Sequence, residues 1–210
     1  MADKLDNICV DKSGSSDLQQ IRELLLEKTW FGFDLDDTLH EFRKASKSAS
    51  RETLLQIARA YHASIGDLQK EYSRILALKT AEAFTDGKIS DEYRKARSIG
   101  KKILIINEGP QDAQEWTLEK LELGYMVDYL ATTNYFGVSK VDGLFEKVLD
   151  HLDIKAADMA YIGDNKERDV EPAMKCGVLT VHYCEKECVD FSVGNMRIKS
   201  MDQLENLLRG

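Results

Sequence analysis

The sequence predicts an α/β fold: a Rossmann-like, doubly wound parallel sheet with a small helical cap inserted after the first strand. Three observations lead to this prediction. Short apolar runs alternate with helical segments through the second half of the chain. Residues 41–97, by contrast, carry helical periodicity alone. Finally, two acidic clusters directly follow apolar runs, where the strands of a parallel sheet end and ligands bind.

The composition is that of a globular protein. The chain has 210 residues, of which 43% are hydrophobic and 31% are charged, and its formal net charge is −8. No basic stripe is visible, so a nucleic acid polymer is not an expected partner. No signal-peptide pattern or apolar run of roughly 18 residues is present, so a membrane is not expected either. We therefore expect a cytoplasmic protein with reduced cysteines, and its oligomeric state stays unknown.

The first two elements are a helix and a buried strand. A polar leader precedes the helix, which Ser16 or Asp17 would cap. The apolar positions of this helix recur at three and four residues, namely Leu18, Ile21 and Leu25. The aromatic run at residues 30–33 then predicts a strand, which stops at the acidic residues 34–37. Carboxylates at the carboxyl end of a strand indicate a functional site.

Residues 41–97 contain no strand candidate. Helix-period apolar positions recur in two segments: Leu54, Leu55 and Ile57, then Leu68, Tyr72, Ile75 and Leu76. We therefore predict a helical cap at 41–97 and an α/β core formed by residues 1–40 and 98–210. Little chain lies between Ile89 and Gly100 for both the end of the cap and a following helix, so a shortened cap is expected.

Alternation of strands and helices resumes after Gly100. Apolar runs predict strands at residues 103–106, 129–132, 159–162 and 178–182. Helices are predicted at residues 111–124, 141–152 and 201–208, and Pro110 and Gly124 bound the first of these. Such alternation implies parallel strands with helices on both faces of the sheet.

Two acidic motifs carry the candidate chemistry. Asp34, Asp36 and Thr38 form the pattern DxDxT after the first strand, and the segment GDNKERD at residues 163–169 supplies Asp164 and Asp169 after a later one. Carboxylates gathered at one sheet edge repel each other, and a divalent cation with a preference for oxygen ligands, such as Mg²⁺, relieves that repulsion. The alternative is that these aspartates are turn residues and helix caps.

These motifs resemble those of the haloacid dehalogenase-like (HAD) hydrolase superfamily, in its phosphatase branch with an inserted helical cap. The resemblance covers nearly all of residues 30–182. It implies that Asp34 is the nucleophile, which forms an aspartyl-phosphate, and that Asp36 is the general acid and base. It also implies that Mg²⁺ is held by Asp34, the backbone carbonyl of Asp36, and Asp164. Asp169 would be a ligand through water or the partner of a cationic lysine.

Further residues are assigned by the same resemblance. Lys140 matches a lysine that neutralises the nucleophile and the transferred phosphate, and Thr38 is expected at the phosphate. At the end of its second core strand the family has a Thr or Ser that binds phosphate, commonly followed within two residues by Gly. Here the matching stretch reads Asn107, Glu108, Gly109, and by the same resemblance these residues are assigned to phosphate binding. The amide of Asn107 still has N–H groups for a phosphate oxygen. Glu108 adds a negative charge that would slow turnover, alter selectivity or point to solvent.

The sequence thus predicts a Mg²⁺-dependent phosphohydrolase that acts on a small phosphorylated metabolite through an aspartyl-phosphate. The second Asp of the DxDxT pattern favours a phosphatase over a dehalogenase. A phosphomutase is an alternative with the same intermediate. The altered second motif and the shortened cap motivate another alternative, a catalytically impaired HAD-like protein that binds phosphate or a partner.

Overall fold

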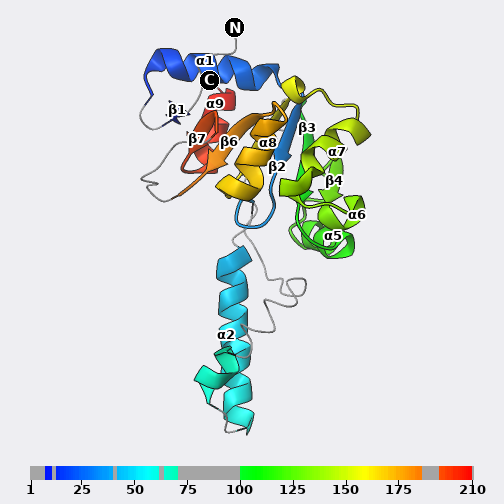
Figure 1. Ribbon diagram of the computed structural model, residues 1–210. Coiled ribbons are helices and arrows are strands. Elements are labelled where there is room, and N and C mark those ends of the chain that lie inside the picture. The colour runs from blue at the N-terminus through cyan, green and yellow to red at the C-terminus, as the bar shows by residue number, and fades with distance from the viewer. Residues whose placement is uncertain are drawn as a thin grey trace.

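A parallel sheet of seven strands lies at the centre of the molecule, in the order β1-β7-β6-β5-β2-β3-β4 (Figure 1). The computed structural model describes residues 8–10, 13–39, 42–61, 64–70, 100–185 and 194–209. The strands are β1 (Ile8–Cys9), β2 (Trp30–Phe33), β3 (Lys102–Asn107), β4 (Tyr129–Thr132), β5 (Met159–Gly163), β6 (Leu179–Tyr183) and β7 (Met196–Ile198). The predicted α/β class is therefore confirmed.

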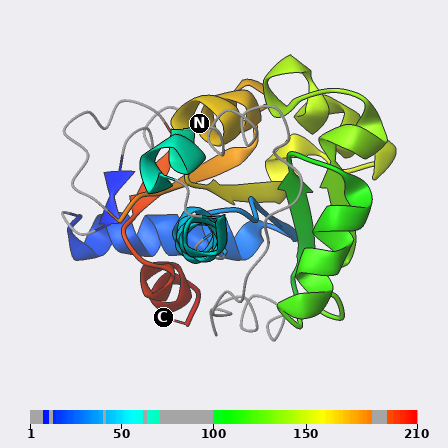
Figure 2. The same cartoon turned by 90° about the horizontal axis from the view of Figure 1, so that it is seen from below.

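Helices cover both faces of this sheet, because alternate side chains along each buried strand point to opposite sides. Phe31 and Ile105 face one core with α1, α5 and α9, whereas Leu104 and Tyr161 face the other with α7 and α8 (Figure 2). The main helices are α1 (Ser15–Glu27), α2 (Phe42–Tyr61), α5 (Gln111–Lys120), α7 (Leu144–His151), α8 (Glu171–Lys175) and α9 (Met201–Arg209). Shorter turns are α6 (Thr133–Phe136), η2 (Lys140–Asp142), η3 (Ala156–Asp158) and η4 (Lys166–Val170).

The sheet order brings the two acidic motifs together. Strand β2 lies between β3 and β5, so the residues that follow these strands share one edge of the sheet. The backbone N–H of Asp34 donates to the carbonyl of Ile162 at 2.9 Å, which extends the contact between β2 and β5 past the last residue of β2. Asp34, Asn107 and Asp164 therefore occupy neighbouring strand ends.

Two glycines permit close packing under this edge. A Cβ on Gly163 would lie 2.5 Å from the Cβ of Asp169, and one on Gly32 would lie 2.8 Å from Cδ2 of Tyr161. Both distances are shorter than side-chain carbons tolerate, so the two strand positions require the absence of a side chain.

All strands predicted from sequence are confirmed, with ends that differ by at most one residue. The patterns do not predict β1 or β7, because strands of two or three residues are too short to show a period. Neither Ser16 nor Asp17 caps the first helix; Gly14 is the N-cap and makes no side-chain bond.

Three further expectations are corrected. Helix α5 ends at Lys120 instead of continuing to Gly124. The helix expected at residues 141–152 is divided into η2 and α7, because Gly143 adopts a left-handed conformation with φ 109°. Cys184 is disulfide-bonded, whereas Cys9 and Cys176 are free thiols as expected.

The predicted cap is described in part. Within residues 42–61 and 64–70 the structure has helix α2 and a helical segment at 65–70, and no strand. Residues 71–99 lie outside the described residues. Figure 1 shows α2 extending away from the sheet on the side of the strands' carboxyl ends. The boundaries at residues 1–40, 41–97 and 98–210 stay a prediction. Among the described residues, no helix combines the length and the hydropathy that crossing a membrane requires.

Candidate active site

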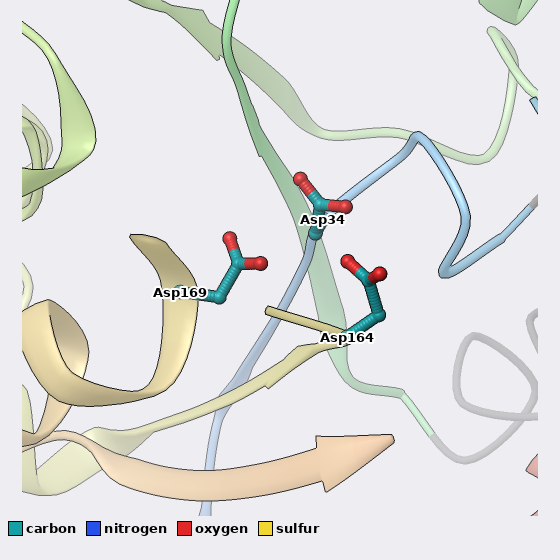
Figure 3. A group of neighbouring side chains, drawn as sticks. All are labelled: Asp34, Asp164 and Asp169. Carbon is teal, nitrogen blue, oxygen red and sulfur yellow. The ribbon is translucent and has the colours of Figure 1, made fainter. Parts of the chain in front are cut away.

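Three carboxylates converge at the carboxyl edge of the sheet. Asp34 directly follows β2, Asp164 directly follows β5, and Asp169 lies in η4. One oxygen from each lies within 4.8 Å of the others, and Figure 3 shows the three side chains turned toward one another. Asp34 and Asp169 are buried, and Asp164 is half-buried and therefore partly open to solvent.

Lys140 is the cation of this cluster. Its Nζ lies 2.5 Å from Oδ1 of Asp34 and 2.5 Å from Oδ1 of Asp169, and its side chain is 2% exposed. The start of η2 carries this lysine to the site, after Ser139 as N-cap. A buried ammonium between two carboxylates is fully desolvated, so its charge acts at nearly full strength on whatever binds at Asp34.

One ammonium does not neutralise this number of carboxylates. The pKa of Asp34 is raised from its ordinary 3.8 to about 8: burial raises it most, Asp169 and Asp36 also raise it, and Lys140 opposes them. Burial also lowers the pKa of Lys140, but the attraction of Asp34 and Asp169 outweighs it, and the net pKa is raised. Without another cation the raised pKa favours the protonated form of Asp34 at neutral pH, while Lys140 stays charged.

Thr38 links the two motifs. Its Oγ1 donates to Oδ2 of Asp34 at 3.2 Å and accepts the backbone N–H of Asp164 at 3.1 Å. Thr38 is 6% exposed. In the structure, therefore, this residue holds Asp34 and the start of the loop after β5 together, and its assignment to phosphate stays a prediction.

Asp36 contacts Asn107, which stands where the sequence comparison led us to expect Thr or Ser. The Nδ2 of Asn107 donates to Oδ2 of Asp36 at 3.1 Å. Asn107 is buried and ends β3, and Asp36 is half-buried. The assignment of Asn107 to phosphate stays a prediction.

Glu108 and Gly109 are bonded to residues outside the carboxylate cluster. An oxygen of Glu108 accepts from Nη1 of Arg168 at 3.0 Å, in a pair of which both side chains are partly exposed. The backbone N–H of Gly109 donates to Oγ1 of Thr133 at 2.9 Å. Their assignment to phosphate binding also stays a prediction, and in this state the N–H of Gly109 is engaged by the protein.

Comparison with known proteins identifies the fold. The chain aligns over 87% of its length with the HAD phosphatase from Thermococcus onnurineus, covering 98% of that protein (TM-score 0.69, 17% identity). It aligns over 88% with the HAD-hydrolase YfnB from Bacillus subtilis, which was solved bound to magnesium, covering 100% of it (TM-score 0.65, 14% identity). The chain has a haloacid dehalogenase-like fold.

Proteins with this fold include both phosphatases and dehalogenases. The 2-haloacid dehalogenase from Pseudomonas syringae pv. Tomato aligns with 87% of the chain, which covers 98% of it (TM-score 0.61, 18% identity). Among curated proteins, the glyceraldehyde 3-phosphate phosphatase of Methanocaldococcus jannaschii is 26% identical over 117 residues. That match takes in 54% of this chain and spans about half of the relative, 51%. No family model matches the chain.

The candidate site contains residues that the sequence motifs do not reveal. Tyr161 directs its hydroxyl at Oδ1 of Asp169, 3.2 Å away, and at the carbonyl of Ile106, 3.1 Å away. The backbone N–H of Asn165 donates to the other oxygen of Asp169 at 3.0 Å. A polar tip two residues before Gly163, in an otherwise apolar strand, is the one signal that marks Tyr161 in the sequence.

These contacts bear on the role of Asp169. The sequence leaves open whether this residue is a ligand through water or the partner of the cationic lysine. The structure shows the pairing with Lys140, with Tyr161 and Asn165 holding the same carboxylate in place. Asp169 nevertheless lies within reach of an ion held by Asp34 and Asp164.

Proposed function

We propose that the protein is a Mg²⁺-dependent phosphohydrolase that removes phosphate from a small phosphorylated metabolite. The observation that carries the proposal is the position of Asp34: it lies within 2.5 Å of a buried ammonium and beside two further carboxylates, at the carboxyl edge of a HAD-like sheet. This environment supplies a nucleophile together with the positive charge that phosphoryl transfer needs.

The residues of the cluster fit a divalent cation. Oxygens of Asp34, Asp164 and Asp169 lie close enough to coordinate one ion, and all are hard ligands of the kind that Mg²⁺ prefers. Burial, and then the negative charges of Asp169 and Asp36, raise the pKa of Asp34, and a bound cation would offset both effects. The backbone carbonyl of Asp36 is proposed as a further ligand by resemblance. When bound, the ion would polarise the phosphoryl oxygens and favour the ionised form of Asp34.

The protein's own groups would then carry out the transfer. Oδ of Asp34 attacks phosphorus, and the bond to the leaving oxygen breaks as Asp36 gives that oxygen a proton. Asp36 afterwards takes a proton from the water that hydrolyses the aspartyl-phosphate. Lys140 stabilises negative charge on Asp34 and on the transferred group. Thr38 keeps Asp34 oriented through its hydrogen bond.

Asp36 is the reason for proposing phosphatase chemistry over dehalogenation, since proteins with this fold include both. A carboxyl group two residues after the nucleophile serves a leaving group that needs a proton, and a halide does not need one. The curated relative is named for glyceraldehyde 3-phosphate, which is consistent with a small phosphorylated substrate here.

The proposal is tested by measuring phosphate release from a panel of phosphorylated metabolites, with Mg²⁺ and with a chelator. Mg²⁺-dependent release supports the proposal and identifies the preferred substrate. Product analysis separates hydrolysis from a phosphomutase, which returns the phosphoryl group to its substrate. Absence of release by a folded protein that binds Mg²⁺ favours the catalytically impaired alternative, for which Asn107 and Glu108 are the motivating residues.

Binding of Mg²⁺ is expected to tighten with rising pH. Because Asp34 has a pKa of about 8 without metal, an ion that binds below this pH has to displace a proton. The affinity should therefore rise by up to about tenfold per pH unit below pH 8 and level off above it. Calorimetry from about pH 6 to about pH 9, in buffers with different ionisation enthalpies, measures both the affinity and the released proton.

The same pKa predicts the stability of the metal-free protein. Between pH 3.8, the ordinary pKa of Asp, and about 8, the folded chain holds a proton on Asp34 that the unfolded chain has lost. The free energy of unfolding should therefore fall as the pH rises through this window. Urea unfolding of the metal-free protein across this pH range measures the effect.

Asp34→Asn is the control for both predictions, since it lacks the proton that Mg²⁺ has to displace from Asp34. A Mg²⁺ affinity of the natural chain that does not change with pH would contradict the prediction of metal binding.

The pair formed by Glu108 and Arg168 is expected to affect substrate binding modestly. Arg168→Ala leaves the carboxylate of Glu108 without its ion-pair partner near the candidate phosphate site, so we expect KM to rise about two- to fivefold. The double variant Glu108→Gln/Arg168→Ala should return KM toward that of the natural chain. If the double variant binds as poorly as Arg168→Ala, the arginine contacts the substrate directly, and the prediction is wrong.

The cytoplasm stays the proposed compartment. The free thiols of Cys9 and Cys176 are consistent with reducing conditions, whereas the disulfide at Cys184 is the observation against them. Cell fractionation with the tagged chain, combined with mass spectrometry of the Cys184 thiol, tests the assignment.

A further inference from the structure

Asn107 occupies a position from which it acts on the proposed acid and base. It is the last residue of β3, its side chain is 2% exposed, and its Nδ2 lies 3.1 Å from Oδ2 of Asp36. Asp36 itself follows the neighbouring strand β2, 71 positions away in the sequence. The hydrogen bond therefore ties two strand ends together at the carboxyl edge.

A side-chain amide can donate more hydrogen bonds at one time than a hydroxyl can. The hydroxyl of Thr or Ser has one proton to donate, whereas the Asn side chain has two N–H groups on one nitrogen. Asn107 can therefore donate to Asp36 with one N–H and direct the second toward a bound phosphate oxygen. The bond to Oδ2 also sets the plane of the Asp36 carboxyl group, and so the direction in which Oδ1 lies.

We propose that Asn107 is a positioning residue that holds Asp36 for proton transfer to the leaving oxygen. This inference rests on the proposed phosphohydrolase function. During the first step Asp34 forms a bond to phosphorus, the bond from phosphorus to the leaving oxygen breaks, and the proton of Asp36 passes to that oxygen. Asp36 is left as a carboxylate. The N–H of Asn107 then donates to a charged acceptor, and hydrogen bonds of this kind are about twice as strong as neutral ones.

The leaving group distinguishes this role from simple phosphate binding. An alkyl alkoxide is a poor leaving group that requires the proton of Asp36, whereas p-nitrophenolate leaves without it. A residue that orients Asp36 therefore affects alkyl phosphates selectively. A residue that only binds phosphate affects both substrate types equally, because both carry the same phosphoryl group.

The test compares kcat/KM of Asn107→Ser and the natural chain for two substrates: p-nitrophenyl phosphate and the best alkyl phosphate from the metabolite panel. This parameter reports the steps up to formation of the aspartyl-phosphate, and the serine retains a donor for phosphate. For the alkyl phosphate we expect a loss of about 10- to 100-fold, the range for a hydrogen bond to a charged group. For p-nitrophenyl phosphate we expect a loss below about threefold.

Two controls sharpen the result. Asn134→Ser makes the same change on exposed α6 and should alter neither substrate. Asp36→Asn should show the same preference for the aryl substrate, and adding Asn107→Ser to it should cost little more, because the two residues act through one hydrogen bond. Equal losses for both substrates would overturn the positioning role alone. A natural chain inactive on both substrates would overturn the proposed function and this inference with it.

Discussion

Asp34→Asn is expected to abolish phosphate release, with kcat/KM lower by at least about 10³-fold on every substrate of the natural chain. The amide has the size of the carboxylate but is not a nucleophile toward phosphorus. It also leaves one carboxylate fewer around Lys140, whose Nζ donates a hydrogen bond to Oδ1 of Asp34 at 2.5 Å in the natural chain. The measurement is phosphate release under saturating Mg²⁺, with mass spectrometry of the quenched natural enzyme to detect a phosphorylated Asp34.

A neighbouring residue provides the matched control. Asp37→Asn makes the same chemical change three positions away, at a residue with φ 63°, where Asn is tolerated as well as Asp. We expect this variant to stay active. The metal-free Asp34→Asn protein should be at least as stable as the natural chain, because a buried carboxyl group that resists ionisation has been removed. Substantial activity in a folded Asp34→Asn variant would rule out the covalent mechanism.

Lys140→Met is expected to damage both stability and activity. The methionine fills similar space but removes the ammonium that pairs with the buried carboxylate of Asp169 and lies 2.5 Å from Asp34. Removing one partner of a buried ion pair costs about 3–5 kcal/mol of the free energy of unfolding. The loss of charge at the transferred phosphoryl group should lower kcat by about 10²–10³-fold. Urea unfolding and steady-state kinetics give the two values.

Three comparisons separate these effects of Lys140. Lys147→Met removes an exposed lysine from α7 and should change neither quantity by much. Mg²⁺ should restore more stability to Lys140→Met than it adds to the natural chain, because the ion replaces part of the missing charge. Adding Asp169→Asn should likewise restore stability without restoring activity. A Lys140→Met protein as stable and active as the Lys147→Met control would show that the buried pair has neither role.

Much of the fold could be predicted because its signals are local. The buried strands at residues 30–33 and 103–106 are continuous apolar runs, and their environment on both faces of the sheet is apolar. The prediction of one continuous helix at residues 141–152 is wrong because a single glycine, Gly143, interrupts the apolar periodicity. Strand β1 pairs with β7, and β7 pairs with β6. The local sequence of β1 and β7 does not indicate these pairings.

The sequence by itself determined the positions of Asp34 and Asp164, because an apolar strand that ends in a carboxylate places that group at the carboxyl edge of a parallel sheet. Only the tertiary structure decided which groups meet there. Lys140 reaches Asp169 across 29 positions, Arg168 reaches Glu108 across 60, and Asn107 reaches Asp36 across 71. The physical reason is that hydrogen bonds and ion pairs form over about 3 Å and depend on side-chain direction. Strand order and packing set that direction, and motif spacing does not.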